Sequence, residues 1–186
     1  SELTSGNFSS RYSKQGIVFG STGPMCFEKE KNNIFYCLAL LNSKQANNFF
    51  RIMNPTIHYN VSVIENTPFI DIAYNIRAVI EEQAKKLVFT AKSEWDSRET
   101  SWDFKANQLV ISNEELVMEK ILDAFDLYTK FWKEKFYEMH RNEEELNRLF
   151  IEIYGLEDEM TPDVDLKDIT LLKKELLRRK SAKKAT

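Results

Sequence analysis

The pattern of apolar and polar positions divides the chain into a mixed front part and a helical rear part. In the front part, short runs of β-branched and aromatic residues stand between Gly, Ser and Pro turns. They predict short strands at residues 17–19, 25–27 and 56–61 and further short extended pieces at 63–64 and 68–70. Residues 33–53 instead show three- and four-residue spacing, which predicts helix with a break near Asn42-Ser43 and an end before Pro55.

Behind Asp71, apolar residues recur at helical spacing. A first helix is predicted over residues 71–91, with a stripe formed by Ile72, Ile76, Val79, Ile80, Gln83 and Leu87. A second, longer helix is expected to begin at Ser112, which forms a capping box with Glu115, and to stop at Gly155 as the C′ residue. Its stripe is close to a heptad seam and consists of Ile121, Phe125, Tyr128, Trp132, Met139, Leu146, Leu149 and Ile153.

These elements predict an α+β fold that is mostly α. We expect a small α/β subdomain over residues 1–70, an elongated antiparallel helical hairpin over residues 71–155, and a connector with a terminal amphipathic helix over residues 156–186. A helix of about forty residues spans ~60 Å, of which residues 71–91 can cover only roughly half. The uncovered seam, like the start at Ser1 without an initiator Met, indicates a segment of a longer protein.

Composition narrows the class of protein. The 186 residues are 42% hydrophobic with only 5 Gly and 4 Pro, which favours an ordered core over low-complexity disorder. No apolar run approaches the roughly 20 residues of a membrane span, and no signal-peptide pattern is present. Cys26 and Cys37 lack CxxC spacing and are predicted to be reduced thiols of a cytoplasmic protein, with a disulfide or metal pair as the alternative.

Charge is distributed unevenly along the chain. The net charge is −3, with 26 basic and 29 acidic residues. Residues 1–60 nevertheless carry six basic side chains (Arg11, Lys14, Lys29, Lys31, Lys44 and Arg51) against three acidic ones (Glu2, Glu28 and Glu30). Nucleic-acid binding usually shows as a basic surface. A mildly positive front part fits such binding, and chance asymmetry is the alternative.

No catalytic site is predicted. His58 and His140 lie in a predicted strand and on the long helix, where an isolated His is usually packed or on the surface, and no glycine-rich phosphate loop occurs. The sequence Asn54-Pro55-Thr56-Ile57 resembles only the first half of the Asn-Pro-Pro-Tyr element of amino-methyltransferases. Thr56 and Ile57 supply neither the second proline nor the aromatic ring that stacks on an extruded adenine. We expect no catalytic residue and no metal site.

Several segments together resemble one protein family. The most distinctive are EWDSRETSWDF at residues 94–104 and NEEELNRLFIEIYGLEDEMTP at residues 142–162. The others are SSRYSKQGIVF at 9–19, LLNSKQA at 40–46, IMNPTI at 52–57 and NTPF at 66–69. They resemble the target-recognition and helical-spacer region of PglX-type enzymes, the adenine-specific DNA methyltransferases of BREX phage-defence systems.

This resemblance implies that the intact protein transfers a methyl group from S-adenosylmethionine to adenine N6 in a defined DNA sequence. It also implies that the catalytic and cofactor-binding domain lies N-terminal to this segment, so we expect no cofactor in the segment itself. The expected partners are duplex DNA and the catalytic methyltransferase domain of the same parent chain, without a membrane. A second hypothesis is a helical interaction module that docks other defence-system subunits.

Sequence reading needs side chains that reach base edges and cations that neutralise phosphates. In the front part, the candidates for DNA contact are Arg11, Lys14, Lys44, Asn47, Arg51 and His58. Arg11 can pair bidentately with guanine, and Asn47 or Asn48 with adenine, each for ~1–3 kcal/mol of discrimination. The alternative for the Asn pair is an exposed helix face. Of His58 and Tyr59, only one can face the DNA, because neighbours in a strand point to opposite faces.

The two Trp-Asp pairs form a structural motif in this interpretation. Trp95 and Trp102 are expected to bury large apolar areas at a helix–helix corner, and Asp96 and Asp103 to cap helix starts. The alternative role is a docking surface for the catalytic domain.

Overall fold

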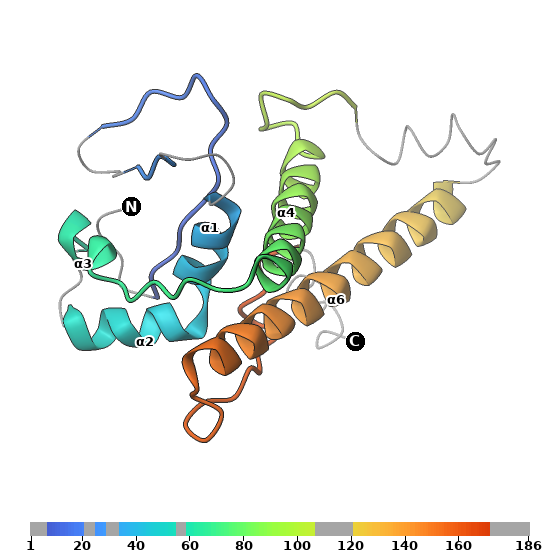
Figure 1. Ribbon diagram of the computed structural model, residues 1–186. Helices are drawn as coiled ribbons and strands as arrows, with labels where there is room; N and C mark the ends of the chain where they lie inside the picture. The colour runs from blue at the N-terminus through green and yellow to red at the C-terminus, as the bar shows by residue number, and fades with distance from the viewer. Residues whose placement is uncertain (1–6, 21–24, 29–33, 55–58, 107–120, 172–186) are drawn as a thin grey trace. The chain divides into compact units, whose positions relative to one another are not determined.

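Helices make up the regular structure of residues 7–20, 25–28, 34–54, 59–106 and 121–171, which the computed structural model describes (Figure 1). They are α1 (Ile34–Asn42), α2 (Lys44–Met53), α3 (Val61–Glu65), α4 (Tyr74–Asp96) and α6 (Ile121–Tyr154). No strand occurs within these ranges. The prediction of a mostly α fold is therefore confirmed, whereas its α/β component is not.

The predicted strands are wrong wherever the structure describes them. Residues 17–19 and 25–27 have no regular secondary structure, and residues 63–64, predicted to be extended, lie in α3. Of the run 56–61, residues 56–58 lie outside the described residues and Val61 begins α3. A β-branched run becomes a strand only if a neighbouring strand supplies its backbone hydrogen bonds. The described part of the chain offers these runs no such neighbour.

A serine cap separates α1 from α2, at the break that the sequence predicts near Asn42-Ser43. The Ser43 backbone N–H donates to the Leu40 carbonyl at 3.0 Å, which ends α1. Its side-chain oxygen then accepts a hydrogen bond from the Ala46 N–H at 3.2 Å, which satisfies one of the free donors at the start of α2. This helix ends at Met53, two residues before Pro55.

The long helix α6 ends at the predicted glycine. Gly155 has φ +63°, the left-handed conformation that favours glycine. Its N–H donates to the Glu152 carbonyl at 3.2 Å, and the Leu156 N–H donates to the Ile151 carbonyl at 3.0 Å. This pair of bonds is the Schellman motif. The predicted start at Ser112 lies outside the described residues, but the 34 residues of α6 already span about 50 Å.

The chain divides into two units. The first comprises residues 1–86 and 144–163, and the second comprises residues 87–143 and 164–186. Helices α4 and α6 each contribute to both. The boundaries expected from the sequence, after residues 70 and 155, stay predictions.

Aromatic side chains hold the first unit together. Phe8, Phe50 and Tyr59 are buried, and their ring centroids lie 4.8 to 5.8 Å apart. A second group surrounds Tyr36, which is fully buried between Phe69 and Phe150 at centroid distances of 5.1 and 5.7 Å. Such edge and tilted contacts add to the stabilisation from burial itself. The first unit therefore fixes α1, α2 and the end of α6 against one another.

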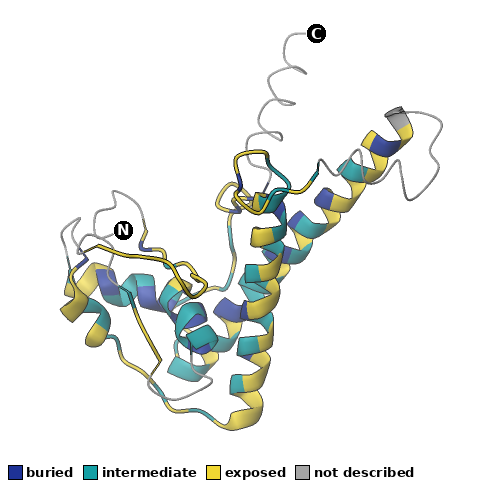
Figure 2. Ribbon diagram, turned by 90° about the horizontal axis from the view of Figure 1, so that it is seen from above, coloured by how far each residue is buried: buried dark blue, intermediate teal, exposed yellow. Residues whose placement is uncertain are grey.

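The second unit has its own core on one face of α6. Its buried members are Trp132, Phe136, Met139, Ile169 and Leu171, against which Leu87, Tyr128 and Val164 pack. Figure 2 shows buried and exposed residues alternating along α6, as expected for an amphipathic helix. Leu171 lies in this core, while the rest of the predicted terminal helix lies outside the described residues.

The buried stripe of helix α4 is narrower than the sequence predicts. It begins three residues later than expected and runs on to Asp96. Ile80 and Ala84 are buried, but Ile76 and Val79 are 38% and 49% exposed. Helical spacing identifies the apolar side of a helix, whereas the fraction of that side that is covered depends on the elements packed against it.

Candidate nucleic-acid interface

An irregular loop at the start of the first unit, residues 7–20, is anchored at its base and exposed at its far end. Phe8 is buried in the aromatic core. The Ser10 N–H donates to the Asn42 side-chain oxygen at 2.9 Å, and the Asn42 amide donates to the Ser10 hydroxyl at 2.9 Å. Tyr12 stacks on Phe35 of α1 with ring centroids 5.1 Å apart. These contacts fix the first half of the loop on α1.

Beyond Tyr12 every side chain of this loop is exposed. Arg11 and Lys14, both predicted as DNA contacts, present their cations on this surface. Ile17, Val18 and Phe19 follow them and are 48%, 95% and 52% exposed. The sequence interpretation missed this apolar tip because an Ile-Val-Phe run between glycines is typical of a buried strand. The signal that could have found it is the complete lack of acidic residues between Glu2 and Glu28.

The predicted residues of α2 share one face of that helix. Lys44, Asn47 and Arg51 are three and seven residues apart, which aligns them on the helix surface. The Lys44 Nζ donates to the Thr161 carbonyl at 2.9 Å, and Arg51 donates to the Asn7 side-chain oxygen at 2.8 Å. Both acceptors are uncharged, so these two bonds leave the positive charges uncompensated.

The structure brings some predicted residues together and separates others. Arg51 contacts the loop through Asn7, and the same loop carries Arg11 and Lys14. Lys44, at the opposite end of α2, is directed to the connector at Thr161. Asn47 donates to the Ser43 carbonyl at 3.1 Å, four residues earlier in the chain. His58 lies outside the described residues.

A buried asparagine of α6 positions the start of α2. The Asn147 side-chain oxygen accepts from the Lys44 N–H at 3.0 Å, and its amide donates to the Pro162 carbonyl at 3.3 Å. Its backbone carbonyl accepts from the fully buried Gln45 side chain at 3.5 Å. One residue thus ties α2, α6 and the connector together. Because it supplies an acceptor to the first turn of α2, it also helps to fix the helix that carries Lys44 and Arg51.

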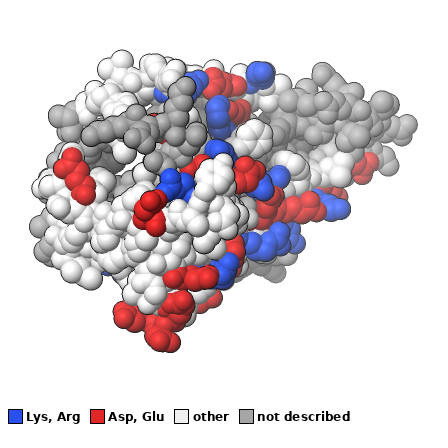
Figure 3. Space-filling view, in the orientation of Figure 1, with Lys and Arg blue, Asp and Glu red and all other residues white. Residues whose placement is uncertain are grey.

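The helices nearest the loop lack negative side chains. Neither α1 nor α2 contains an Asp or Glu. By contrast, acidic and basic residues alternate along α6, and Figure 3 shows these charges gathered along that helix. Residues 1–60, which carry the positive part of the charge asymmetry, all lie in the first unit, which also contains acidic residues of α4 and of the end of α6.

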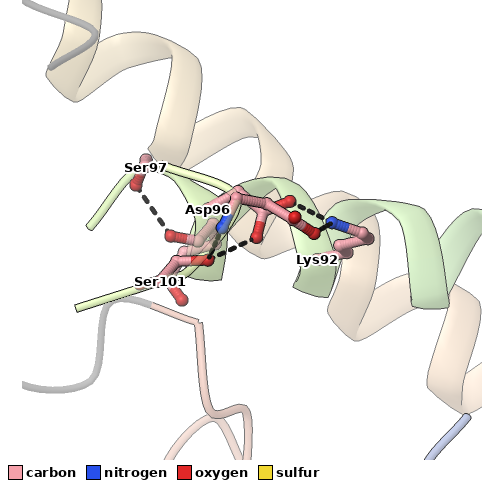
Figure 4. A network of polar contacts seen from close by, with 6 residues as sticks. Lys92, Asp96, Ser97 and Ser101 are labelled. Atoms are coloured by element: carbon pink, nitrogen blue, oxygen red, sulfur yellow. Dashed lines mark hydrogen bonds and ion pairs between the residues drawn. The ribbon is translucent and has the colours of Figure 1, made fainter. Parts of the chain in front are cut away.

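A network of polar contacts orders the turn after α4, where the Trp-Asp motif lies (Figure 4). Lys92 forms ion pairs with Asp96 and with Asp103, the latter at 2.9 Å. The Ser101 hydroxyl donates to Asp96 at 2.8 Å, and the hydrogen bond from Lys92 lowers the pKa of Asp96. Arg98 pairs with the buried Glu94. The turn is thus held by side chains on both sides of it.

The predicted burial of Trp102 is wrong, and Trp95 is about half buried. The Trp102 side chain is 103% exposed and Trp95 is 52% exposed. Asp96 is the last residue of α4, so it does not cap a helix start, and Asp103 pairs with Lys92 in the turn. The tryptophan that fills a core is Trp132, at 1% exposure. The alternative reading of the motif, a docking surface, stays a prediction.

Burial perturbs a few titratable groups elsewhere. Desolvation raises the pKa of Tyr36 to about 12, and its hydroxyl donates to the Ile70 carbonyl at 3.3 Å. Desolvation also raises the pKa of Glu143 to about 7, against which His140 lowers it and Asp168 raises it further. Burial is the largest cause of both shifts, so both groups are assigned to packing.

No group of three or more His, Cys, Asp or Glu side chains that could hold a metal ion gathers among the described residues. The described glycines Gly16, Gly20 and Gly155 have open space around an added Cβ, so none lies in a tight approach to another part of the chain. None of the helices described is long and apolar enough to cross a lipid bilayer.

Comparison with known proteins finds two bacterial relatives. Over 179 residues, 96% of its length, the chain is 33% identical to the adenine-specific methyltransferase PglX of Lacticaseibacillus casei (strain Zhang), of which it covers 15%. Over 162 residues, 86% of its length, it is 28% identical to the adenine-specific methyltransferase BrxX of Escherichia coli O9:H4 (strain HS), of which it covers 12%. No protein-family model matches the chain. The resemblance drawn from the sequence motifs is confirmed.

Proposed function

Because the chain corresponds to one segment of the PglX-type adenine-specific methyltransferases, we propose that it is part of the target-recognition and spacer region of such an enzyme. In this role it binds duplex DNA through its first unit and leaves methyl transfer to other parts of the parent protein. DNA binding and target recognition are thus the roles of this segment, and the parent enzyme uses S-adenosylmethionine elsewhere in its chain.

One observation supports DNA binding most strongly. The loop of residues 7–20 and helices α1 and α2 contain four cationic side chains and no acidic one, and they are packed together in one unit. The cations are Arg11, Lys14, Lys44 and Arg51. Since a phosphate backbone is recognised mainly by Lys and Arg, segments that carry four cations and no acidic side chain suit it.

Arg51 is the best placed of these cations for a base or a bidentate phosphate contact. Its bond to Asn7 holds one side of the guanidinium while other N–H groups stay available in the planar fork. It is also exposed, although it lies on a helix whose opposite side, at Ala46 and Phe50, is fully buried. A cation on a rigid element loses less conformational entropy on binding.

The test is duplex binding by fluorescence anisotropy across a salt series. Each lost phosphate contact reduces the slope of log K against log salt by about 0.9. We expect Arg51→Gln to lose one such step and Arg51→Lys to keep it. The control is Lys86→Ala on α4, whose cation already lies 3.7 Å from Glu82. If Arg51→Gln and Arg11→Gln behave like the control, the cations of the loop and of α2 do not bind DNA.

A methyl-transfer assay tests the second half of the proposal. The chain lacks the Pro-Tyr half of the amino-methyltransferase element, having Thr56 and Ile57 there, and has no glycine-rich cofactor loop. With labelled S-adenosylmethionine and duplex DNA, the chain alone should transfer no label above a protein-free blank. Transfer that survives purification to a single species would contradict the proposal.

The exposed indole of Trp102 supports a second candidate function, protein docking. A fully exposed Trp on a turn held by Lys92, Asp96 and Ser101 resembles the aromatic anchors that dominate protein interfaces. The test is binding to the L. casei PglX from which the matching segment is deleted. Trp102→Ala should weaken this binding roughly tenfold or more, as hot-spot truncations do. Equal binding by Trp102→Ala and wild type would remove this candidate.

A further inference from the structure

The apolar tip of the first unit, residues 17–19, is largely exposed. Val18 is 95% exposed, and its neighbours Ile17 and Phe19 are about half exposed. The ring of Phe19 contacts the ring of Phe27, itself 66% exposed, at a centroid distance of 5.5 Å. Three consecutive large apolar residues on a surface are a feature of binding sites, since their exposure costs free energy that a partner recovers.

The base of the loop is held by several contacts, whereas its tip is exposed. Phe8 is buried, Ser10 and Asn42 exchange hydrogen bonds, and Tyr12 stacks on Phe35. The chain then turns at Gln15-Gly16, where Gly16 has φ +91°. An L side chain rarely adopts this conformation, so the glycine permits the turn between the anchored half and residues 17–19. The tip is therefore presented by a fixed support.

The charge around the tip selects the class of partner. Residues 7–27, the segment that carries the apolar tip, contain Arg11 and Lys14 and no acidic residue, and Glu28 follows Phe27. Such a surface fits a polyanion with an apolar interior. Duplex DNA has this construction, with phosphates outside and stacked bases inside, and so does an anionic membrane. The similarity to adenine-specific methyltransferases favours DNA.

We propose that Ile17, Val18 and Phe19 form an apolar wedge that enters a base step of duplex DNA, while Arg11 and Lys14 contact the flanking phosphates. This inference rests on the proposed DNA-binding function and adds a mode of binding to it. Apolar side chains that enter between base pairs partly unstack them, and the cost of unstacking depends on how firmly the step is stacked. A wedge therefore binds more tightly where stacking is already broken.

The experiment compares two probes, a short mixed-sequence duplex and the same duplex with one central abasic site. Binding to both is measured by fluorescence anisotropy at low salt and across a salt series. We expect the wild-type chain to bind the abasic duplex about tenfold more tightly. At the abasic site the base stacking is already broken, so the wedge need not supply that free energy. Val18→Ser should reduce this preference to about twofold or less and leave the salt slope on the paired duplex unchanged, since no cation is lost.

The matched control is Ile52→Ser, which makes a similar change at an 81% exposed position on α2. It should keep the wild-type preference. Both side chains are solvent-exposed, so both variants should melt like the wild type, and Phe19→Ala provides a second probe of the tip.

The outcomes separate the wedge from the proposed function. Duplex binding with no abasic preference, or with a preference that Val18→Ser retains, overturns the wedge and leaves DNA binding standing. No binding to either duplex at low salt contradicts both. The same proteins are mixed with vesicles of phosphatidylcholine containing phosphatidylserine. Vesicle binding that Val18→Ser abolishes, without an abasic preference in the wild type, assigns the tip to a membrane surface and also overturns the wedge.

Discussion

The three tryptophans of this chain allow a direct comparison of sequence motif and tertiary burial. Trp102 belongs to the distinctive Trp-Asp motif and is 103% exposed, whereas Trp132 lies at an unremarkable position of α6 and is 1% exposed. We predict that Trp102→Ala leaves the stability of the chain unchanged and that Trp132→Ala strongly reduces it. The tryptophan of the motif is in solvent, whereas the tryptophan of α6 fills a core.

The magnitudes follow from burial. Removing a buried Trp side chain costs about 3–5 kcal/mol, because transfer free energy is lost and a cavity remains. The neighbours that would line this cavity include Phe131, whose ring centroid lies 5.2 Å away, and the core residues Phe136 and Met139. Trp102 loses no buried area, so its substitution should change the free energy of unfolding by less than ~0.5 kcal/mol. Trp95, at 52% exposure, should fall between the two.

The assay is thermal unfolding followed by circular dichroism, with urea unfolding as a second measurement. For a chain of this size, 1 kcal/mol corresponds to about 2–4 °C in Tm. Trp132→Ala should therefore lower Tm by roughly 6–20 °C, and Trp102→Ala by less than about 2 °C. Because the chain has two units, near-UV circular dichroism should show the loss in the unit that contains Trp132. A Trp102→Ala chain that melts as low as Trp132→Ala would refute the exposed turn and restore the packing role expected from the sequence.

Three further predictions concern the elements that position the candidate interface and the second core. Asn147→Leu leaves the Lys44 N–H and the Pro162 carbonyl without their partner and should cost about 2–4 kcal/mol in urea unfolding; Asn147→Asp, which keeps the acceptor, should cost less. Gly155→Ala forces a side chain into φ +63° and should cost about 1–2 kcal/mol by the same measurement, and an unchanged urea midpoint would contradict the left-handed helix end. Glu143 has its pKa raised from 4.5 to about 7 by burial, with His140 lowering and Asp168 raising it, so the folded state binds its proton more tightly than the unfolded state. Its contribution to stability is complete below pH 4.5 and is lost as the pH rises through about 7, so Glu143→Gln should match the wild type in acid and exceed it in urea midpoint above pH 7; equal midpoints at both pH values would contradict the burial of this carboxyl.

Local signals in the sequence determine where the helices of this protein begin and end. Ser43 caps α2 because its hydroxyl reaches an N–H three residues on, and Gly155 ends α6 because it alone accepts the left-handed conformation there without strain. The cap and the helix end depend on atoms within one or two turns of the chain, so the sequence is sufficient to predict them. The stripe of α6 identifies the apolar side of that helix: Trp132, Met139 and Leu146 are buried as predicted, but Phe125 of the same stripe is 40% exposed.

Only the tertiary structure decides which apolar residues are covered. The run Ile17-Val18-Phe19 has the composition of a buried strand, but no strand of the described chain pairs with it and it stays exposed. Trp102 has the chemistry of a core residue, yet its turn is fixed by side-chain bonds among Lys92, Asp96 and Ser101 and leaves the indole in solvent. Likewise, the Lys44 ammonium group is held by the carbonyl of Thr161, which lies more than a hundred residues away in the sequence. Burial depends on partners distant in sequence, and the spacing of residues along one segment carries no information about them.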